Sequence, residues 1–170
     1  MYYLLVLGVG IERLIELIVA KRNAAWAFAR GGREFGHGHY PVMVALHSLL
    51  LLGCVAEVWL LHRPFLAWLG WPMLALVVAA QALRWWCITT LGRRWNTLVI
   101  VIPGEPLVQR GPYRFIRHPN YVAVAAEGLA LPLVHTAWVT ALCFTIANAL
   151  LMWVRIGIEN RALGYASGRV

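Results

Sequence analysis

A short polar segment at residues 108–121 carries the side chains of this chain whose types could do chemistry. It reads Val-Gln-Arg-Gly-Pro-Tyr-Arg-Phe-Ile-Arg-His-Pro-Asn-Tyr and lies between two strongly apolar regions. Its notable members are Arg110, Arg114, Arg117, Tyr113, Tyr121, His118 and Pro119. Guanidinium groups bind anions, and aromatic rings stack on cations and planar groups. The segment could therefore bind a charged small molecule that also has a group able to stack on an aromatic ring.

Three roles could explain such a segment: contact with anionic lipid, capping of a helix, or a binding pocket. Contact with lipid head groups needs arginines but has no use for a His-Pro pair or two tyrosines. Capping explains Pro119, which suits the first position of a helix, and also Asn120, but it does not explain Tyr121. A pocket for a charged, stackable small molecule accounts for all of these residues.

A second polar cluster lies near the carboxyl end of the chain. Arg155 and Glu159 are four residues apart on one helical face, and Asn160 and Arg161 follow directly. The spacing fits an ordinary ion pair on a helix surface, and it equally fits a second wall of the same pocket. Glu127 follows the segment by about two helical turns, and it either faces the pocket or pairs with a basic side chain.

The elements that hold these residues are predicted to be membrane helices. The chain has 170 residues, of which 61% are hydrophobic and only 13% are charged, and its mean hydropathy is +0.68. Soluble proteins carry roughly 25% charged residues. Nine tryptophans and six tyrosines are typical of a protein with two membrane interfaces. We therefore expect an all-α integral membrane protein, because helices satisfy their own backbone hydrogen bonds in lipid.

About five membrane helices are expected within one domain covering 1–170. Their predicted ranges are 1–20, 41–61, 65–91, 119–131 and 136–155, the last one continuing through Tyr165. Residues 1–91 form three helices, 92–118 a cytosolic cofactor loop, and 119–165 a helical hairpin with its extension. The fourth helix is too short to cross about 30 Å of hydrocarbon alone, which favours the hairpin.

The distribution of basic residues predicts on which side of the membrane each end of the chain lies. The net charge is +8, and the basic residues concentrate in 21–39, in 92–118 and in the carboxyl tail. Positive residues mark cytoplasmic connections, so we expect the amino terminus outside and the carboxyl terminus in the cytosol. The arginines are scattered over loops, which favours contacts with membrane lipids and no nucleic-acid partner.

Other ionisable residues remain open at this level. Glu12 and Glu16 share a helical face, with Arg13 able to reach Glu16, and they either hold helices together or line a polar cavity. Glu57 lies within the second helix. His37 and His39 stand in a glycine-rich loop, but without a third ligand they predict no metal site. The three cysteines fall within predicted helices and are expected to be buried apolar residues.

The segment 111–121 resembles the cofactor-binding signature of the isoprenylcysteine carboxyl methyltransferase family. The shared pattern is Gly-x-Tyr-Arg-x-x-Arg-His-Pro-x-Tyr followed by a helical hairpin, and Arg155 and Glu159 resemble the family's carboxyl-terminal arginine and glutamate. The phrases at 11–17, 36–41 and 91–97 are similar to a short bacterial branch of the family. That branch includes enzymes that O-methylate long-chain alkylpyrones.

The resemblance implies S-adenosylmethionine as methyl donor, in a pocket that faces the cytosol. It assigns cofactor contacts to Gly111, Tyr113, Arg117, His118, Pro119, Tyr121 and Glu159. It makes Arg155 and Glu159 the catalytic pair, with Arg155 beside the acceptor oxygen. The implied acceptor is lipophilic, either the carboxylate of prenylcysteine or the hydroxyl of an alkylpyrone, and the implied location is a bacterial inner or plasma membrane.

Three positions depart from the family pattern. Ala123 stands where many members have glycine, Asn160 stands where many have a second acid, and Pro132 stands near the position of a polar residue in the hairpin of larger eukaryotic members. These differences leave the cofactor assignment in place but weaken transfer of the prenylcysteine substrate. Phospholipid N-methylation is the alternative reaction, and a non-catalytic lipid-binding membrane protein is the alternative of another class. A transporter is disfavoured, because the polar residues gather on one side of the membrane and no inverted repeat is visible.

Overall fold

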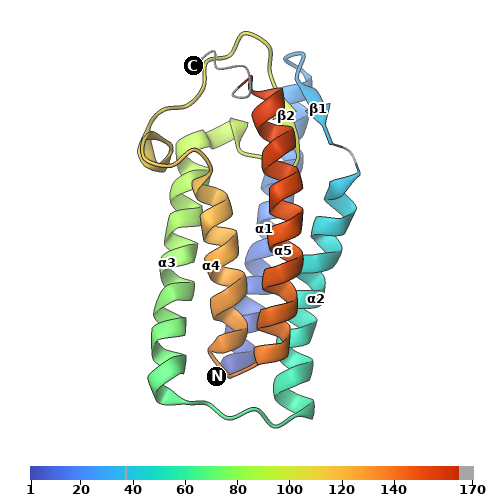
Figure 1. Ribbon diagram of the computed structural model, residues 1–170. Helices are drawn as coiled ribbons and strands as arrows, with labels where there is room; N and C mark the ends of the chain where they lie inside the picture. Colours follow the sequence, from blue (N-terminus) through green and yellow to red (C-terminus); the bar gives the residue numbers. More distant parts are fainter. Residues whose placement is uncertain (37, 165–170) are drawn as a thin grey trace.

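A computed structural model describes residues 1–36 and 38–164, which form a bundle of long helices closed at one end by loops (Figure 1). The elements in chain order are α1 (Tyr2–Phe28), β1 (Arg33–Phe35), α2 (His39–Leu60), α3 (Ala67–Leu91), the 3-10 turn η1 (Gly92–Arg94), β2 (Val99–Val101), the 3-10 turn η2 (Gly111–Arg114), α4 (Pro119–Leu133) and α5 (Trp138–Ala162). Successive helices run in opposite directions. The connection between α1 and α2 therefore lies at the same end as the segment 92–118.

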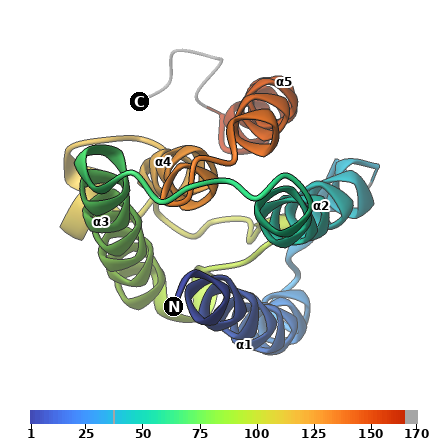
Figure 2. The ribbon, with the colours of Figure 1, turned by 90° about the horizontal axis from the view of Figure 1, so that it is seen from below.

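The helices are arranged so that α4 lies between α3 and α5, and α2 lies beside α5 (Figure 2). Helix α1 lies on the other side of the bundle, next to α2. Within the described residues, three helical stretches are long and apolar enough to cross a membrane: His39–Leu60, Ala67–Arg94 and Trp138–Ala162. The predicted membrane protein is confirmed at this level. Whether α1 and the short α4 also lie in the membrane remains a prediction.

Helix α1 is longer than predicted. It continues from the expected end at Ala20 through Lys21 and Arg22 to Phe28. The basic residues at 21–22 suggested the start of a loop, but lysine and arginine have good helix propensity. The chain meets its first residue with positive φ only at Gly31, where φ is +76°. The prediction of a loop over 21–28 is therefore wrong, whereas the predicted bounds of α2 and α3 agree within two residues.

The loop end of the bundle contains a small antiparallel sheet. β1 pairs with β2, with Glu34 opposite Ile100. Residues 99–102 are a short β-branched run, a composition that favours an extended backbone, and their pairing with residues before α2 was not predicted. The all-α prediction therefore misses this two-stranded element. The sheet fixes 99–101 above the ends of α3 and α5, where the pocket described below is found.

The hairpin of α4 and α5 begins at Pro119, as predicted, and α4 ends at Leu133 instead of Leu131. Pro132 fits within its last turn. Glu57 of α2 holds the start of α5, because its carboxylate accepts hydrogen bonds from the backbone N–H groups of Val139 (3.2 Å) and Thr140 (2.7 Å). A carboxylate at a helix amino end is favoured by the helix dipole. Arg63 neutralises this carboxylate at 2.8 Å.

The apolar core lies at the end of the bundle remote from the loops. It joins the start of α1 to the middle of α2 and the end of α4, through residues that include Tyr2, Val6, Cys54, Val77, Leu131 and Phe144. The hydroxyl of Tyr2 donates to the carbonyl oxygen of Leu131 at 3.1 Å. Among the described residues, a small second cluster of Ala20, Ile88 and Trp95 lies near the loop end. The loop end therefore has room for cavities.

A buried ion cluster links α1, α3 and α4. Arg13 lies 2.6 Å from Glu16 and 3.3 Å from Glu127, and Arg84 lies 3.0 Å from Glu127 and 3.6 Å from Glu16. Glu12 accepts hydrogen bonds from Gln81 and Trp85 at the edge of this cluster. Of the two roles left open for Glu127, the structure shows pairing with basic side chains.

Gly128 allows α4 to pack closely against Phe144 of α5. A Cβ at this position would overlap the ring of the buried Phe144, whereas a Cβ at Gly8 of α1 would meet nothing within 4 Å. We expect Gly128→Ala to lower the stability of the protein by roughly 1–3 kcal/mol, the usual range for overpacking. Gly8→Ala should be neutral or stabilising, because alanine favours helix. Thermal unfolding in detergent checks both, and equal unfolding temperatures for the two variants would contradict this packing.

Candidate functional site

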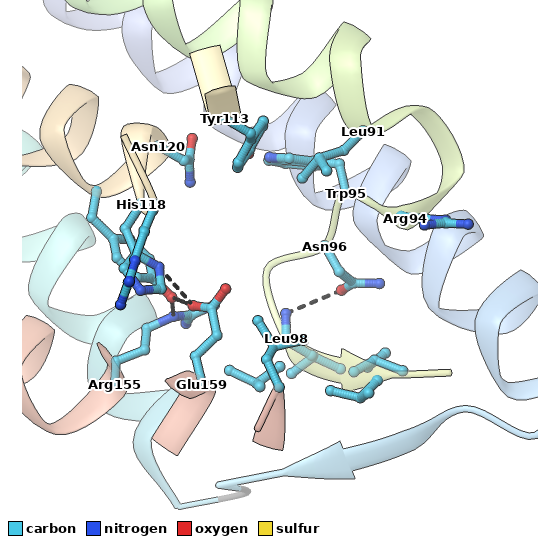
Figure 3. Close-up of a pocket in the computed structure, with 16 residues that line it drawn as sticks. Leu91, Arg94, Trp95, Asn96, Leu98, Tyr113, His118, Asn120, Arg155 and Glu159 are labelled. Atoms are coloured by element: carbon cyan, nitrogen blue, oxygen red, sulfur yellow. Dashed lines mark hydrogen bonds and ion pairs between the residues drawn. The ribbon is translucent and has the colours of Figure 1, made fainter. Parts of the chain in front are cut away.

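A pocket lies at the loop end of the bundle, where the segment 95–101 passes over α4 and α5 (Figure 3). The chain enters this region from α3, and Asn96 holds the turn by accepting a hydrogen bond from the N–H of Leu98 at 3.0 Å. The side chains around the pocket include Arg94, Trp95, Asn96, Leu98, Tyr113, Arg117, His118, Asn120, Tyr121, Arg155 and Glu159. The two polar clusters found in the sequence therefore meet in one site.

His118 is held on three sides. Its ring stacks on Tyr121 with centroids 5.3 Å apart and an interplanar angle of 16°. Its Nε2 lies 2.9 Å from Oδ1 of Asn160, and because an amide oxygen only accepts, Nε2 carries the hydrogen. Its Nδ1 lies 3.7 Å from Glu159. The family departure at Asn160 thus supplies the hydrogen-bond partner that fixes this ring.

Tyr121 connects the two residues predicted to be catalytic. Its hydroxyl donates to Oε2 of Glu159 and accepts from Nε of Arg155 at 2.8 Å. The 3.6-residue helical period had left open a direct surface ion pair between Arg155 and Glu159. Their described contacts run through the phenol instead, so the three side chains form one hydrogen-bonded relay across α4 and α5.

Arg155 is buried, with 4% of its surface exposed. Its Nη2 donates to the carbonyl oxygen of Thr97 and its Nη1 lies 3.0 Å from the sulfur of Met43. These described hydrogen bonds, like the one to Tyr121, end on neutral acceptors. The charge of the guanidinium is therefore available to an anionic oxygen that binds in this poorly solvated site.

Tyr113 and Arg117 also line the pocket. Burial raises the pKa of the Tyr113 phenol, and the nearby thiol of Cys87 adds to this effect. Tyr113 therefore remains a neutral hydrogen-bonding ring at any physiological pH. Arg117 is exposed and brings positive charge to the rim.

Gly111 and Pro119 lie close to the pocket but are not among its lining residues. Gly111 has φ of +57°, and a Cβ there would collide with Thr90 of α3. Pro119 is fully buried at the start of α4. Both place the segment against the bundle, and their predicted contact with a cofactor remains a prediction.

Several lining residues were not among the predicted site residues. Trp95 and Asn120 are the most informative, because the Nε1 of Trp95 and the Oδ1 of Asn120 are buried and have no hydrogen-bond partner within the described part of the chain. Asn120 fitted either a helix start or the pocket, but it was not named among the predicted cofactor contacts. Its position between Pro119 and Tyr121, two predicted cofactor contacts, was the signal that could have identified Asn120 as a pocket residue. In the sequence, Trp95 was noted only as part of the stretch 91–97 that is similar to a branch of the family. His37 lies outside the described residues, and His39 does not line this pocket.

Comparison with known proteins agrees with the signature seen in the sequence. The isoprenylcysteine carboxyl methyltransferase family matches residues 73–165 of this chain. The chain is also 40% identical over 164 residues, 96% of either chain, to the uncharacterized protein YpbQ of Bacillus subtilis (strain 168). The matched region holds α4, α5 and the segment that forms the pocket. The chain therefore belongs to the isoprenylcysteine carboxyl methyltransferase family and is a membrane methyltransferase of that type.

Proposed function

We propose that the protein is an S-adenosylmethionine-dependent O-methyltransferase that acts on a lipophilic acceptor from the bilayer. The observation that carries the proposal is the relay from Glu159 through Tyr121 to Arg155. Glu159 faces the pocket below the loop 95–101, whereas Arg155 and Tyr121 also line a second cavity between α1 and α2. The relay thus joins a polar pocket to a lipid-accessible one.

The residues of the first pocket fit S-adenosylmethionine by their chemistry. Glu159 offers a carboxylate for the ribose hydroxyls or the ammonium group of the cofactor. The unpartnered Oδ1 of Asn120 and Nε1 of Trp95 offer one acceptor and one donor for a purine edge. Stacked His118 and Tyr121 form an aromatic wall that can contact a sulfonium cation. A buried polar atom without a partner is uncommon, which supports a ligand at this place.

The protein's own contribution to methyl transfer is alignment and charge. When bound, S-adenosylmethionine supplies an electrophilic methyl group, which passes to the acceptor oxygen as the S–C bond breaks and a C–O bond forms. Arg155 would hold that oxygen as its anion, in line with the donor, through the remaining N–H groups of a guanidinium that Thr97 and Tyr121 already fix in place. Such fixed donors cost little reorganisation in a water-poor site. Glu159 would orient the donor side, because Tyr121 ties it to Arg155.

The second cavity suits a hydrocarbon acceptor. Leu14, Leu17 and Val44 line it on the side of α1 and α2, and Leu14 is 62% exposed on the outer surface of the bundle. In a membrane this surface would face lipid, so an acceptor could reach Arg155 without passing through water. An alkylpyrone hydroxyl is our preferred acceptor and a prenylcysteine carboxylate the second, since both give an oxyanion on a long apolar chain.

The membrane arrangement follows from the same proposal. We place all five helices in or against a bacterial inner or plasma membrane, with the amino terminus outside and the pocket facing the cytosol. The basic residues of the loop end support this orientation, and the relative from Bacillus subtilis supports a bacterial membrane. S-adenosylmethionine is water-soluble, so a pocket on the cytosolic side would have access to it.

Binding of S-adenosylmethionine separates the proposal from a non-catalytic lipid-binding protein. We expect micromolar binding by calorimetry to the purified protein, and at least tenfold weaker binding by His118→Ala, which loses the Tyr121 stack and the Asn160 hydrogen bond. His62→Ala is a matched control, because His62 lies in the turn before α3 at the other end of the bundle. Absence of binding by a folded wild-type protein would refute the proposal.

The class of acceptor is tested by methyl transfer to three lipids. The panel contains a prenylcysteine, a long-chain alkylpyrone and phosphatidylethanolamine, each with the same labelled donor. We expect product from an oxygen acceptor and most turnover with the alkylpyrone. Turnover on phosphatidylethanolamine alone would replace O-methylation by phospholipid N-methylation.

A further inference from the structure

The buried ion cluster of α1, α3 and α4 forms one wall of the cavity between α1 and α2. Arg13, Glu16 and Arg84 all line this cavity, which encloses about 200 Å³ and also reaches Tyr121 and Arg155. Charged residues at membrane depth are costly and usually serve a site. The proposed methyl transfer uses Arg155 and leaves this second charged wall without a function.

A purely structural role explains only part of the cluster. Salt bridges engage Oε2 of Glu16 and the terminal nitrogens of both arginines. Oε1 of Glu16, Nε of Arg13 and Nε of Arg84 are buried and have no hydrogen-bond partner within the described residues. Glu16 and Arg84 are only 5% and 4% exposed. Each buried polar group without a partner destabilises the folded protein, so a cluster that served only to hold the helices together would be poorly constructed.

His47 adds a further polar atom to the same cavity. Its Nδ1 lies 2.8 Å from the carbonyl oxygen of Met43, and because a carbonyl only accepts, Nδ1 carries the hydrogen. In the neutral ring, Nε2 is then an acceptor. The wall therefore offers two acceptors, at Glu16 and His47, and two donors, at the arginine Nε atoms.

We propose that Arg13, Glu16 and Arg84 recognise the polar head of the acceptor lipid, separately from the oxygen that is methylated. This rests on the proposed function and narrows its substrate class. The acceptor is a single-tailed lipid with a small oxygen-rich head. That head carries one oxyanion for Arg155, a hydroxyl or N–H donor for Glu16, and a carbonyl-type oxygen for the arginines. A head with only one oxygen would leave Oε1 of Glu16 without a hydrogen-bond donor.

The test compares two lipids that differ by one hydroxyl. A resorcinol with a long meta-alkyl chain and the matching monohydroxy phenol are measured for equilibrium binding to the protein in nanodiscs. We expect the resorcinol to bind at least tenfold more tightly, because a site built to hydrogen-bond a hydroxyl rejects the analogue that lacks it. Glu16→Gln should reduce this preference to less than threefold, since the amide can donate as well as accept.

A matched control is Glu57→Gln. Glu57 is an equally buried, arginine-paired glutamate on α2 that does not line the cavity, so its variant should keep the preference. If Glu16→Gln does not fold, Leu14→Trp provides the second arm. It fills the outer side of the cavity and should weaken both lipids at least tenfold while leaving S-adenosylmethionine binding intact.

Three results would overturn the inference: equal binding of the two lipids by the wild type, a preference that survives in Glu16→Gln, or full lipid binding by Leu14→Trp. Failure of the proposed function looks different. In that case the hydroxyl preference would be present and would depend on Glu16, but no methyl group would be transferred to any lipid. The binding readout therefore decides the inference independently of catalysis.

Discussion

Arg155→Lys should lower kcat/KM for methyl transfer by roughly 100-fold to 1,000-fold, the range found when a donor to a developing or bound oxyanion is removed. Lysine keeps the charge but loses the fixed fork of N–H groups. In this protein that fork spans Tyr121, Thr97 and the proposed acceptor oxygen. The affinity for S-adenosylmethionine should change by less than about fivefold, because Glu159 and His118 remain.

A control for this substitution lies one and a half turns further along α5. Arg161 is exposed, and its described hydrogen bond goes to the carbonyl oxygen of Gly157. Arg161→Lys should therefore leave kcat/KM within about twofold. The comparison is made with steady-state kinetics on the preferred oxygen acceptor. Equal activity of the two variants would show that Arg155 does not hold the acceptor.

Glu159→Gln should weaken S-adenosylmethionine binding by about 10-fold to 100-fold, which corresponds to loss of a charge-assisted hydrogen bond. The amide keeps the shape of the carboxylate but cannot accept at both oxygens or balance a cation. It also loses the charge that faces His118 at 3.7 Å. Calorimetry on the detergent-purified protein measures this effect directly.

Glu105→Gln is the matched control for the cofactor pocket. Glu105 is in the same loop region and pairs with Arg94, but it is exposed and does not line the pocket. Its variant should bind S-adenosylmethionine as the wild type does. If Glu105→Gln and Glu159→Gln weakened binding equally, the effect would come from overall charge, and the assigned role of Glu159 would be wrong.

Much of the helical framework could be predicted because the signals are local. The apolar runs of α2 and α3 end at proline, glycine and basic residues, and Pro119 marks the start of α4. The missed part of α1 shows the limit of such signals. Lys21 and Arg22 mark the expected edge of the membrane, but a change in polarity does not end a helix when no residue breaks the backbone hydrogen bonding.

The sheet and part of the site could not be predicted because they depend on contacts between distant residues. Glu34 and Ile100 lie far apart in the chain, and although the β-branched run at 99–102 favours an extended backbone, nothing near it in the sequence indicates its partner. The sequence indicated that Arg155 and Glu159 belong together with the segment at 118–121. Spacing alone gave no means to foresee that the Tyr121 hydroxyl would lie between them.

The departures from the family pattern gain a physical reason from the structure. Asn160 contacts the His118 ring, so an amide at this position fixes the imidazole where many relatives have an acid. Ala123 is fully buried in α4 and its methyl group is accommodated there. Pro132 falls in the last turn of α4, where a missing N–H donor disturbs little of the helix. None of the three conflicts with the proposed cofactor site.

The most direct test of the account is transfer of a labelled methyl group from S-adenosylmethionine to lipid by the purified protein in nanodiscs. The account predicts label in the organic extract, attached through oxygen. Alkali releases that label as methanol if the product is an ester and leaves it in place if the product is an aryl or enol ether that resists hydrolysis. The Arg155→Lys protein should yield at most about 1% of the wild-type rate. Label found only on nitrogen, or no labelled lipid from a protein that binds S-adenosylmethionine and the acceptor, would contradict it.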